Sequence, residues 1–326
     1  MPRIQLGIIG SGGMSTRRAE NFARRQDVNI RVIAARNTTT GPALASKIGV
    51  ECVSDWQALL SMDDLDAVFV GTHNKIHGAI TIAALEAGKH VFSEYPISRL
   101  PEEGRQIARL IAAPTSPVLR TTHNESISAE HTALKDQVSQ MGPLLTSHFF
   151  RFTPGRGGRP EVLFNLRLSG PPALFFVYHV NTYVSLFGAA EWVHCAAQYD
   201  GLNAEEGYDR FVNTLTVGFA SGGTGQWTWA GGIEIETAVQ EARIVMREGT
   251  LIETDTGWDI SLPSGTSPLA FGDNTHTLED QFVADILDGE TDWRDHAEVA
   301  LNAAAIGHAA EISVNDSKVV QMGKCQ

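Results

Sequence analysis

The strongest constraint on the fold is a glycine cluster that directly follows an apolar segment near residue 10. Residues 4–9 have the pattern of a buried strand and residues 16–25 that of a helix, and the turn between them contains Gly10, Ser11, Gly12, Gly13 and Met14. Glycines in such a turn let the backbone approach a pyrophosphate, and the N–H groups at the helix start hold that anion. Ser15 stands where the pattern G-x-G-x-x-G has its third glycine. The turn predicts a dinucleotide site; the alternative is a glycine turn of an ordinary α/β protein.

Short apolar strands alternate with helices up to residue 122. We expect helices at 40–48, 77–87 and 101–112, and further strands at 30–35, 65–71, 89–94 and 118–122. This alternation is typical of parallel βαβ units. The first fold prediction is therefore an α/β domain at 1–122, an N-terminal Rossmann doubly wound parallel sheet.

The pattern changes after residue 122. We expect helices at 129–141, 171–187, 278–287 and 295–312, and longer strands of alternating polarity at 144–153, 192–199, 211–220, 225–229, 238–247 and 251–254. Alternation along a strand is typical of antiparallel sheets. The sequence thus predicts a second, α+β domain at 123–326 with a large antiparallel sheet, which serves substrate binding and oligomerisation.

Charge and cysteine content narrow the function. The chain has 326 residues, a net charge of −13 and three scattered cysteines. Without a basic stripe, nucleic acid and anionic membrane surfaces are not expected partners. No apolar run approaches the roughly 20 residues that span a bilayer. We expect a cytoplasmic protein, acting on a small-molecule substrate, that forms a homo-oligomer.

The end of the second strand bears on the choice of cofactor. Where NAD-binding sheets place an acid, this chain has no carboxylate but Arg36 and Asn37. A guanidinium can pair with a 2′-phosphate, and the asparagine can hydrogen-bond. The sequence therefore favours NADP (NADPH) over NAD; an arginine on a solvated surface is the alternative.

Two further motifs carry a family resemblance. The pattern T-x-N-x-x-H covers Thr72–His77, and A-G-K-H-V-x-x-E-x-P covers Ala87–Pro96. Together with the glycine turn, they resemble the Gfo/Idh/MocA oxidoreductases, named for glucose–fructose oxidoreductase, inositol dehydrogenase and a rhizopine-catabolism protein. The resemblance covers nearly the whole chain. It implies that the ends of these strands bind the cofactor, through Thr72, His73, Asn74, His77 and Glu94. No acid or cysteine completes a metal site with the two histidines, so no metal is expected.

The chain departs from the sugar dehydrogenases of that family. Tyr95 stands in place of the lysine of their E-K-P motif, and Tyr178 and Asn181 stand where their second signature has histidine and aspartate. The chain resembles the biliverdin reductase branch more closely, in E-Y-P, in V-S-L-F-G at 184–188 and in part at 122–126. In that branch, an arginine proposed to act on the bound bile pigment occupies the position that aligns with His179.

These features predict a biliverdin-reductase-like enzyme that transfers hydride from NADPH to a C=C or C=N bond of a linear tetrapyrrole or a related conjugated substrate. The predicted proton donors are Tyr95, His123 and His179, with Glu125 tuning a histidine. We expect His123 and Glu125 to alternate along a strand, and His179 to carry positive charge or deliver a proton. Three arginines could hold a substrate carboxylate: Arg151, Arg156 and Arg159.

Three alternatives stay open. Tyr95 can be a packing residue beside the nicotinamide. The chain can be a sugar or cyclitol dehydrogenase with rearranged proton donors. It can also be a non-catalytic NADP-binding ligand sensor.

Overall fold

The computed structural model describes residues 3–155, 160–289 and 293–323. The chain forms two compact units, 1–127 with 276–301, and 128–275 with 302–326. Helix α11 (Leu278–Asp288) and the start of α12 (Trp293–Asp316) therefore belong to the first unit, whereas the sequence division at residue 122 assigned them to the second. Within the described ranges, no helix is both long enough and apolar enough to cross a membrane.

The first unit contains a six-stranded parallel sheet in the order β3-β2-β1-β4-β5-β6. Its strands are β1 (Ile4–Ile9), β2 (Val28–Ala34), β3 (Glu51–Val53), β4 (Ala67–Val70), β5 (His90–Ser93) and β6 (Leu119–Thr121). All four residues of β4 are buried, as expected for a parallel sheet covered on both faces. This order is the one found in dinucleotide-binding sheets and confirms the doubly wound prediction.

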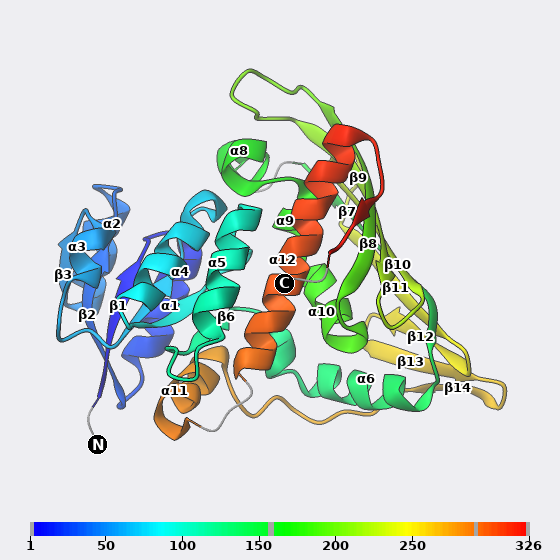
Figure 1. The fold of residues 1–326 in the computed structure, drawn as a ribbon, viewed down its shortest axis with the longest axis horizontal. Coiled ribbons are helices and arrows are strands. Elements are labelled where there is room, and N and C mark those ends of the chain that lie inside the picture. Colours follow the sequence, from blue (N-terminus) through cyan, green and yellow to red (C-terminus); the bar gives the residue numbers. More distant parts are fainter. Residues whose placement is uncertain (1–2, 156–159, 290–292, 324–326) are drawn as a thin grey trace. The chain divides into compact units, whose positions relative to one another are not determined.

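Helices follow the strands of this sheet, as Figure 1 shows. They are α1 (Gly13–Ala23), α2 (Thr40–Ile48), α3 (Trp56–Leu60), α4 (His77–Glu86) and α5 (Pro101–Ile111), with short 3₁₀ turns η1 (Asn74–Ile76) and η2 (Asn124–Ser126). Phe92 of β5 lies between α1 and α11, 6.0 Å from the Phe22 ring and 5.2 Å from the Phe282 ring. These apolar contacts attach α11 to the sheet.

The second unit contains a nine-stranded sheet in the order β14-β13-β12-β11-β7-β10-β9-β8-β15. Its strands are β7 (Leu144–Pro154), β8 (Ala190–Asp200), β9 (Arg210–Phe219), β10 (Thr224–Ile233), β11 (Val239–Met246), β12 (Gly249–Thr254), β13 (Gly257–Leu262), β14 (Gly265–Pro268) and β15 (Val320–Gln321). The pairing is antiparallel except between β7 and β10. The predicted large antiparallel sheet is therefore confirmed, with one parallel pair.

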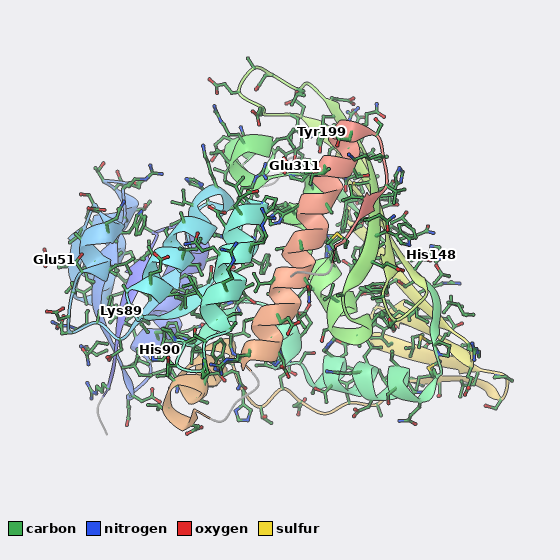
Figure 2. All side chains as sticks on the ribbon, in the orientation of Figure 1. Glu51, Lys89, His90, His148, Tyr199 and Glu311 are labelled. Carbon is green, nitrogen blue, oxygen red and sulfur yellow. The ribbon has the colours of Figure 1, made fainter. Side chains whose placement is uncertain are left out.

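Helices cover one face of this sheet (Figure 1). They are α6 (Ala129–Gln140), α7 (Pro160–Leu163), α8 (Leu166–Ser169), α9 (Pro172–Phe175) and α10 (Val177–Phe187). Buried Phe149, Trp227 and Trp229 project to the helix side, which we call the inner face, while exposed His148 projects from the outer face (Figure 2). The single helix expected at 171–187 is wrong, because the backbone at Phe176 leaves helical values and separates α9 from α10.

Candidate active site

The glycine turn after β1 has the geometry of a phosphate-binding turn. Gly10 adopts a φ of +118°, and a Cβ there would collide with the carbonyl oxygen of Gly71 at the end of β4. Gly12 precedes α1 in extended conformation and has no side chain to cap the helix, so the first N–H groups are left for an anion. A Cβ on Gly13 would meet nothing within 4 Å, and Met14 beside it is exposed. This open, uncapped helix start fits the pyrophosphate of a dinucleotide.

Ser15 explains how the turn tolerates a third position that is not glycine. Its side chain is fully buried, and its hydroxyl donates a 2.8 Å hydrogen bond to the carbonyl oxygen of Gly71. A Cβ on Gly71 would collide with that hydroxyl. The missing side chain at Gly71 therefore provides the space that the third glycine of the pattern usually provides.

The residues predicted to hold the adenosine ribose gather beside this turn. The hydroxyl groups of Ser11 and Thr40 lie 2.7 Å apart, so the glycine turn contacts the start of α2. Arg36 is exposed, and its Nη2 lies 3.4 Å from Nε2 of His73. Asn37 has a different role: its Oδ1 accepts hydrogen bonds from the N–H groups of Thr39 and Thr40, both at 2.9 Å. Arg36 and His73, predicted separately as cofactor-binding residues, thus lie side by side in the structure.

His77 connects the loops that follow β4 and β5. Its Nε2 lies 3.1 Å from the Thr72 carbonyl oxygen and its Nδ1 lies 3.0 Å from the Pro96 carbonyl oxygen. Complete burial lowers the pKa of His77, so the ring is neutral and donates to one of these carbonyls at a time. His77 therefore positions backbone. Asn74 lies in the same loop, at the first position of η1.

Glu94 lies in a buried polar network. One carboxylate oxygen accepts a 2.7 Å hydrogen bond from the Thr122 hydroxyl, and the other lies 3.8 Å from Nε of Arg18. Arg18 also pairs with Glu279 of α11 at 3.0 Å. Burial raises the pKa of Glu94, against the opposing effects of Thr122 and Arg18. Sequence patterns did not indicate the role of Arg18, because its partner Glu279 lies 261 residues away.

Tyr95 and His123 form a stacked pair. Their ring centroids lie 5.0 Å apart with an interplanar angle of 20°, and Nδ1 of His123 lies 2.7 Å from the Thr121 hydroxyl. Burial, with His296 nearby, lowers the pKa of His123 to about 3, the opposite of the tuning expected from Glu125. The predicted alternation of His123 and Glu125 along a strand is wrong, since β6 ends at Thr121 and Glu125 lies in η2.

His179 belongs to a separate cluster within the second unit. The indole N–H of Trp229 donates a 3.0 Å hydrogen bond to its Nδ1, and its ring stacks on Phe176 with centroids 5.7 Å apart. Burial, with Arg151 nearby, lowers the pKa of His179 to about 3. The positive charge expected on His179 is therefore wrong: the ring is neutral at physiological pH. Trp229 was not predicted from the sequence, because no local pattern connects residues 179 and 229.

The remaining predicted residues divide between the described and undescribed parts of the chain. Arg151 lies on β7, where its Nη1 donates a 2.7 Å hydrogen bond to Gln240. Arg156 and Arg159 lie outside the described residues. Across the part of the chain that the structure covers, no group of three or more His, Cys, Asp or Glu residues is arranged to hold a metal ion.

Comparison with known proteins finds similarity to oxidoreductases. Residues 4–119 match the Gfo/Idh/MocA family, described as "Oxidoreductase family, NAD-binding Rossmann fold". The 1,5-anhydro-D-fructose reductase of Ensifer adhaerens is 29% identical over 135 residues, which cover 41% of this chain and 40% of that protein. The matched stretch thus spans about two fifths of that relative.

Two solved structures share the fold over nearly the whole chain. The biliverdin reductase from Synechocystis sp. PCC 6803, in complex with biliverdin and NADP+, has a TM-score of 0.84 at 21% identity, covering 96% of this chain and 99% of that one. A levoglucosan dehydrogenase in complex with NADH and L-sorbose has a TM-score of 0.77 at 18% identity, covering 98% and 99%. These two structures show the shared fold, and the family match at residues 4–119 agrees with the resemblance that the motifs of the sequence carry.

Proposed function

We propose that the protein is an NADPH-dependent reductase of a flat, conjugated substrate, with a linear tetrapyrrole or a related C=C or C=N compound as its substrate class. The observation that carries the proposal is the Tyr95–His123 stack, in which Tyr95 occupies the position of the E-x-P motif where sugar dehydrogenases have a lysine. A phenol that keeps its proton is suited to donating it, whereas oxidation of an alcohol requires a base.

The cofactor part of the proposal depends on Arg36. Arg36 is exposed with its guanidinium beside His73, and no carboxylate occurs at 35–40 to hold the ribose hydroxyls of NAD. A guanidinium is the side chain best suited to a 2′-phosphate. NADPH, when bound, supplies the hydride.

Proton delivery is assigned to Tyr95. Hydride addition to a conjugated substrate builds negative charge on a nitrogen or oxygen, which is costly in a dry site unless a proton arrives. Burial holds both His123 and His179 in the neutral form, so neither is an acid at neutral pH. Tyr95, half-buried on the His123 ring, remains as the donor to that heteroatom.

The composition of the chain supports a proposal about its compartment, oligomeric state and partners. With a net charge of −13, we propose a cytoplasmic homo-oligomer that acts on a small molecule and has neither a nucleic acid nor a membrane partner.

The test is a turnover panel with the full chain. Biliverdin, a cyclic imine, glucose and myo-inositol are each mixed with the protein and with NADPH or NADH, or with the oxidised cofactors for the two polyols. We expect NADPH absorbance to fall with the bilin or the imine and with neither polyol. Oxidation of a polyol would favour the dehydrogenase alternative, and tight NADPH binding without any turnover would favour the sensor.

A variant pair tests the proton donor within the same panel. Tyr95→Phe should keep its NADPH affinity while kcat on the accepted substrate falls roughly ten- to a hundredfold. Tyr199→Phe, on β8 of the second unit, is the matched control and should retain the wild-type rate. A Tyr95→Phe enzyme at full speed would leave Tyr95 with a packing role only.

A further inference from the structure

Three neighbouring strands of the second unit place polar side chains side by side on the inner face. Arg151 of β7 is the register partner of Trp229 on β10 and of Gln240 on β11. Register partners project to the same face of a sheet, close enough to interact. The row Trp229–Arg151–Gln240 therefore runs across the inner face, and Trp229 contacts α10, which carries His179 and Tyr178.

In this row, a neutral amide lies between Arg151 and the carboxyl group of Glu253. Its Nη1 donates to Oε1 of Gln240 at 2.7 Å, and Nε2 of Gln240 donates in turn to Oε1 of Glu253 at 2.8 Å. A neutral amide thus stands between the guanidinium and that carboxylate. Gln240 fixes one arm of Arg151, and the charge of Arg151 also acts on Glu253, against the larger effect of burial, which raises the pKa of that carboxyl. An anion at Arg151 would therefore gain charge-assisted hydrogen bonds beside a carboxyl group that burial favours in its neutral form.

Trp229 determines which nitrogen of His179 carries the proton. An indole N–H can only donate, so Nδ1 of His179, 3.0 Å away, accepts. The neutral ring must then carry its hydrogen on Nε2. Contacts with Phe149 at 4.4 Å and Phe176 at 5.7 Å between centroids fix the plane of the ring. His179 is therefore a fixed neutral N–H donor.

Tyr178 adds a third donor to this cluster. Its ring lies 4.0 Å from the His179 ring between centroids, and burial raises the pKa of its phenol, which keeps its proton. Arg151 is the register partner of Trp229, which donates to His179, so Arg151 and the two rings belong to the same region of the inner face. The charge of Arg151 opposes the raised pKa of Tyr178 and adds to the lowered pKa of His179. One cation and two N–H or O–H donors thus gather on the inner face.

We propose that Arg151, His179 and Tyr178 form a carboxylate-binding subsite in the second unit, and that Trp229 is a positioning residue that holds His179 as an Nε2–H donor. The assignment of this carboxylate to the reductase's substrate rests on the proposed function; the anion site itself does not. Uncharged sugars lack the group that this donor set recognises, whereas charge-assisted hydrogen bonds to a carboxylate are about twice as strong as neutral ones.

The first test follows the His179 ring by nitrogen NMR of the full chain labelled with ¹⁵N-histidine. We expect hydrogen on Nε2 and no titration of this ring between about pH 5 and 8, where ordinary histidines titrate. Hydrogen on Nδ1, or titration within that window, would overturn the positioning role of Trp229. Trp229→Phe should release the ring, so that the second tautomer appears; the wild-type spectrum decides the point even if this variant does not fold.

The second test uses benzoate as the probe and benzamide, its uncharged analogue, as the control. Benzoate should shift the His179 signals and saturate, with benzamide at least tenfold weaker. Arg151→Gln should weaken benzoate at least tenfold, and Arg243→Gln, an exposed arginine of β11 on the outer face, should leave its binding unchanged. Equal shifts with both probes, or undiminished binding in Arg151→Gln, would refute the subsite. Neither test needs cofactor or turnover, so failure of the reductase proposal is a separate result.

Discussion

At the scale of single residues, Arg36 decides the cofactor in the proposed function. Arg36→Ala removes a charge-assisted pair with the 2′-phosphate and should weaken NADPH binding by about 1–3 kcal/mol. NADH lacks that phosphate, and its affinity should barely change. Titration of both cofactors by quenching of tryptophan fluorescence measures the difference.

Arg31 offers a matched control for Arg36. It lies on β2, the strand that Arg36 follows, and pairs with Asp64 at 2.7 Å on the surface. Arg31→Ala should bind both cofactors as the wild type does. An equal loss of NADPH and NADH affinity in Arg36→Ala, or a preference of the wild type for NADH, would contradict the proposal that the protein uses NADPH.

At this scale, the sequence predicted the residues whose role depends on local backbone geometry. Gly10 was predictable because a tight turn after a strand needs a residue that tolerates positive φ, and its φ is +118°. The charge states of His123 and His179 were not predictable. They depend on burial, with smaller effects of His296 on His123 and of Arg151 on His179. The tautomer of His179 depends on a hydrogen bond from Trp229, 50 residues away.

At the scale of elements, the pairing of β6 with α11 makes a sharp stability prediction. Arg120 and Asp285 form an ion pair with side chains 1% and 0% exposed, and Gln281 donates to the same carboxylate. Asp285→Ala leaves a buried guanidinium without its carboxylate and should destabilise the unit by about 3–5 kcal/mol. Hydrogen exchange of peptides over 119–121 and 278–288 measures the local loss.

A double variant separates the charge from the packing. Arg120→Met with Asp285→Leu removes both charges and keeps apolar volume, so most of the lost protection should return. If hydrogen exchange in the double variant is as fast as in Asp285→Ala, the shape of the side chains, and not the unpaired charge, causes the loss of protection.

Elements with a strong local pattern were predictable, and those set by distant contacts were not. The predicted helix at 40–48 coincides with α2, and the apolar run at 65–71 contains β4. The attachment of α11 to the first unit depends on pairs such as Arg18–Glu279, which no local periodicity reveals. The parallel pairing of β10 with β7 likewise joins strands far apart in the chain, Thr224 facing Thr146.

At the scale of the whole molecule, both units bury neutral histidines. His77 and His123 in the first unit and His179 in the second have pKa values lowered mainly by burial. The unfolded chain takes up a proton on each histidine below about pH 6.5, while the folded chain does not. Stability is therefore lost as the pH falls through the unfolded value. Glu94 and Glu253 act in the opposite sense, because their raised carboxyl pKa values let the folded chain bind protons first.

A comparison of variants isolates one histidine from these opposing groups. The pKa of His123 is about 3 in the folded chain. When the pH is lowered from about 7 to 5, proton uptake by this histidine in the unfolded chain should reduce the free energy of unfolding by about 2 kcal/mol. His123→Gln lacks this proton uptake, so its stability should fall by that much less than the wild type's over the same interval. His148→Gln, on the outer face of the large sheet, is the control and should follow the wild type (Figure 2). Urea unfolding at the two pH values, monitored by hydrogen exchange at β6, gives the comparison. Equal losses of stability in the wild type and in His123→Gln would mean that His123 is protonated in the folded chain. His123 would then again be a possible proton donor.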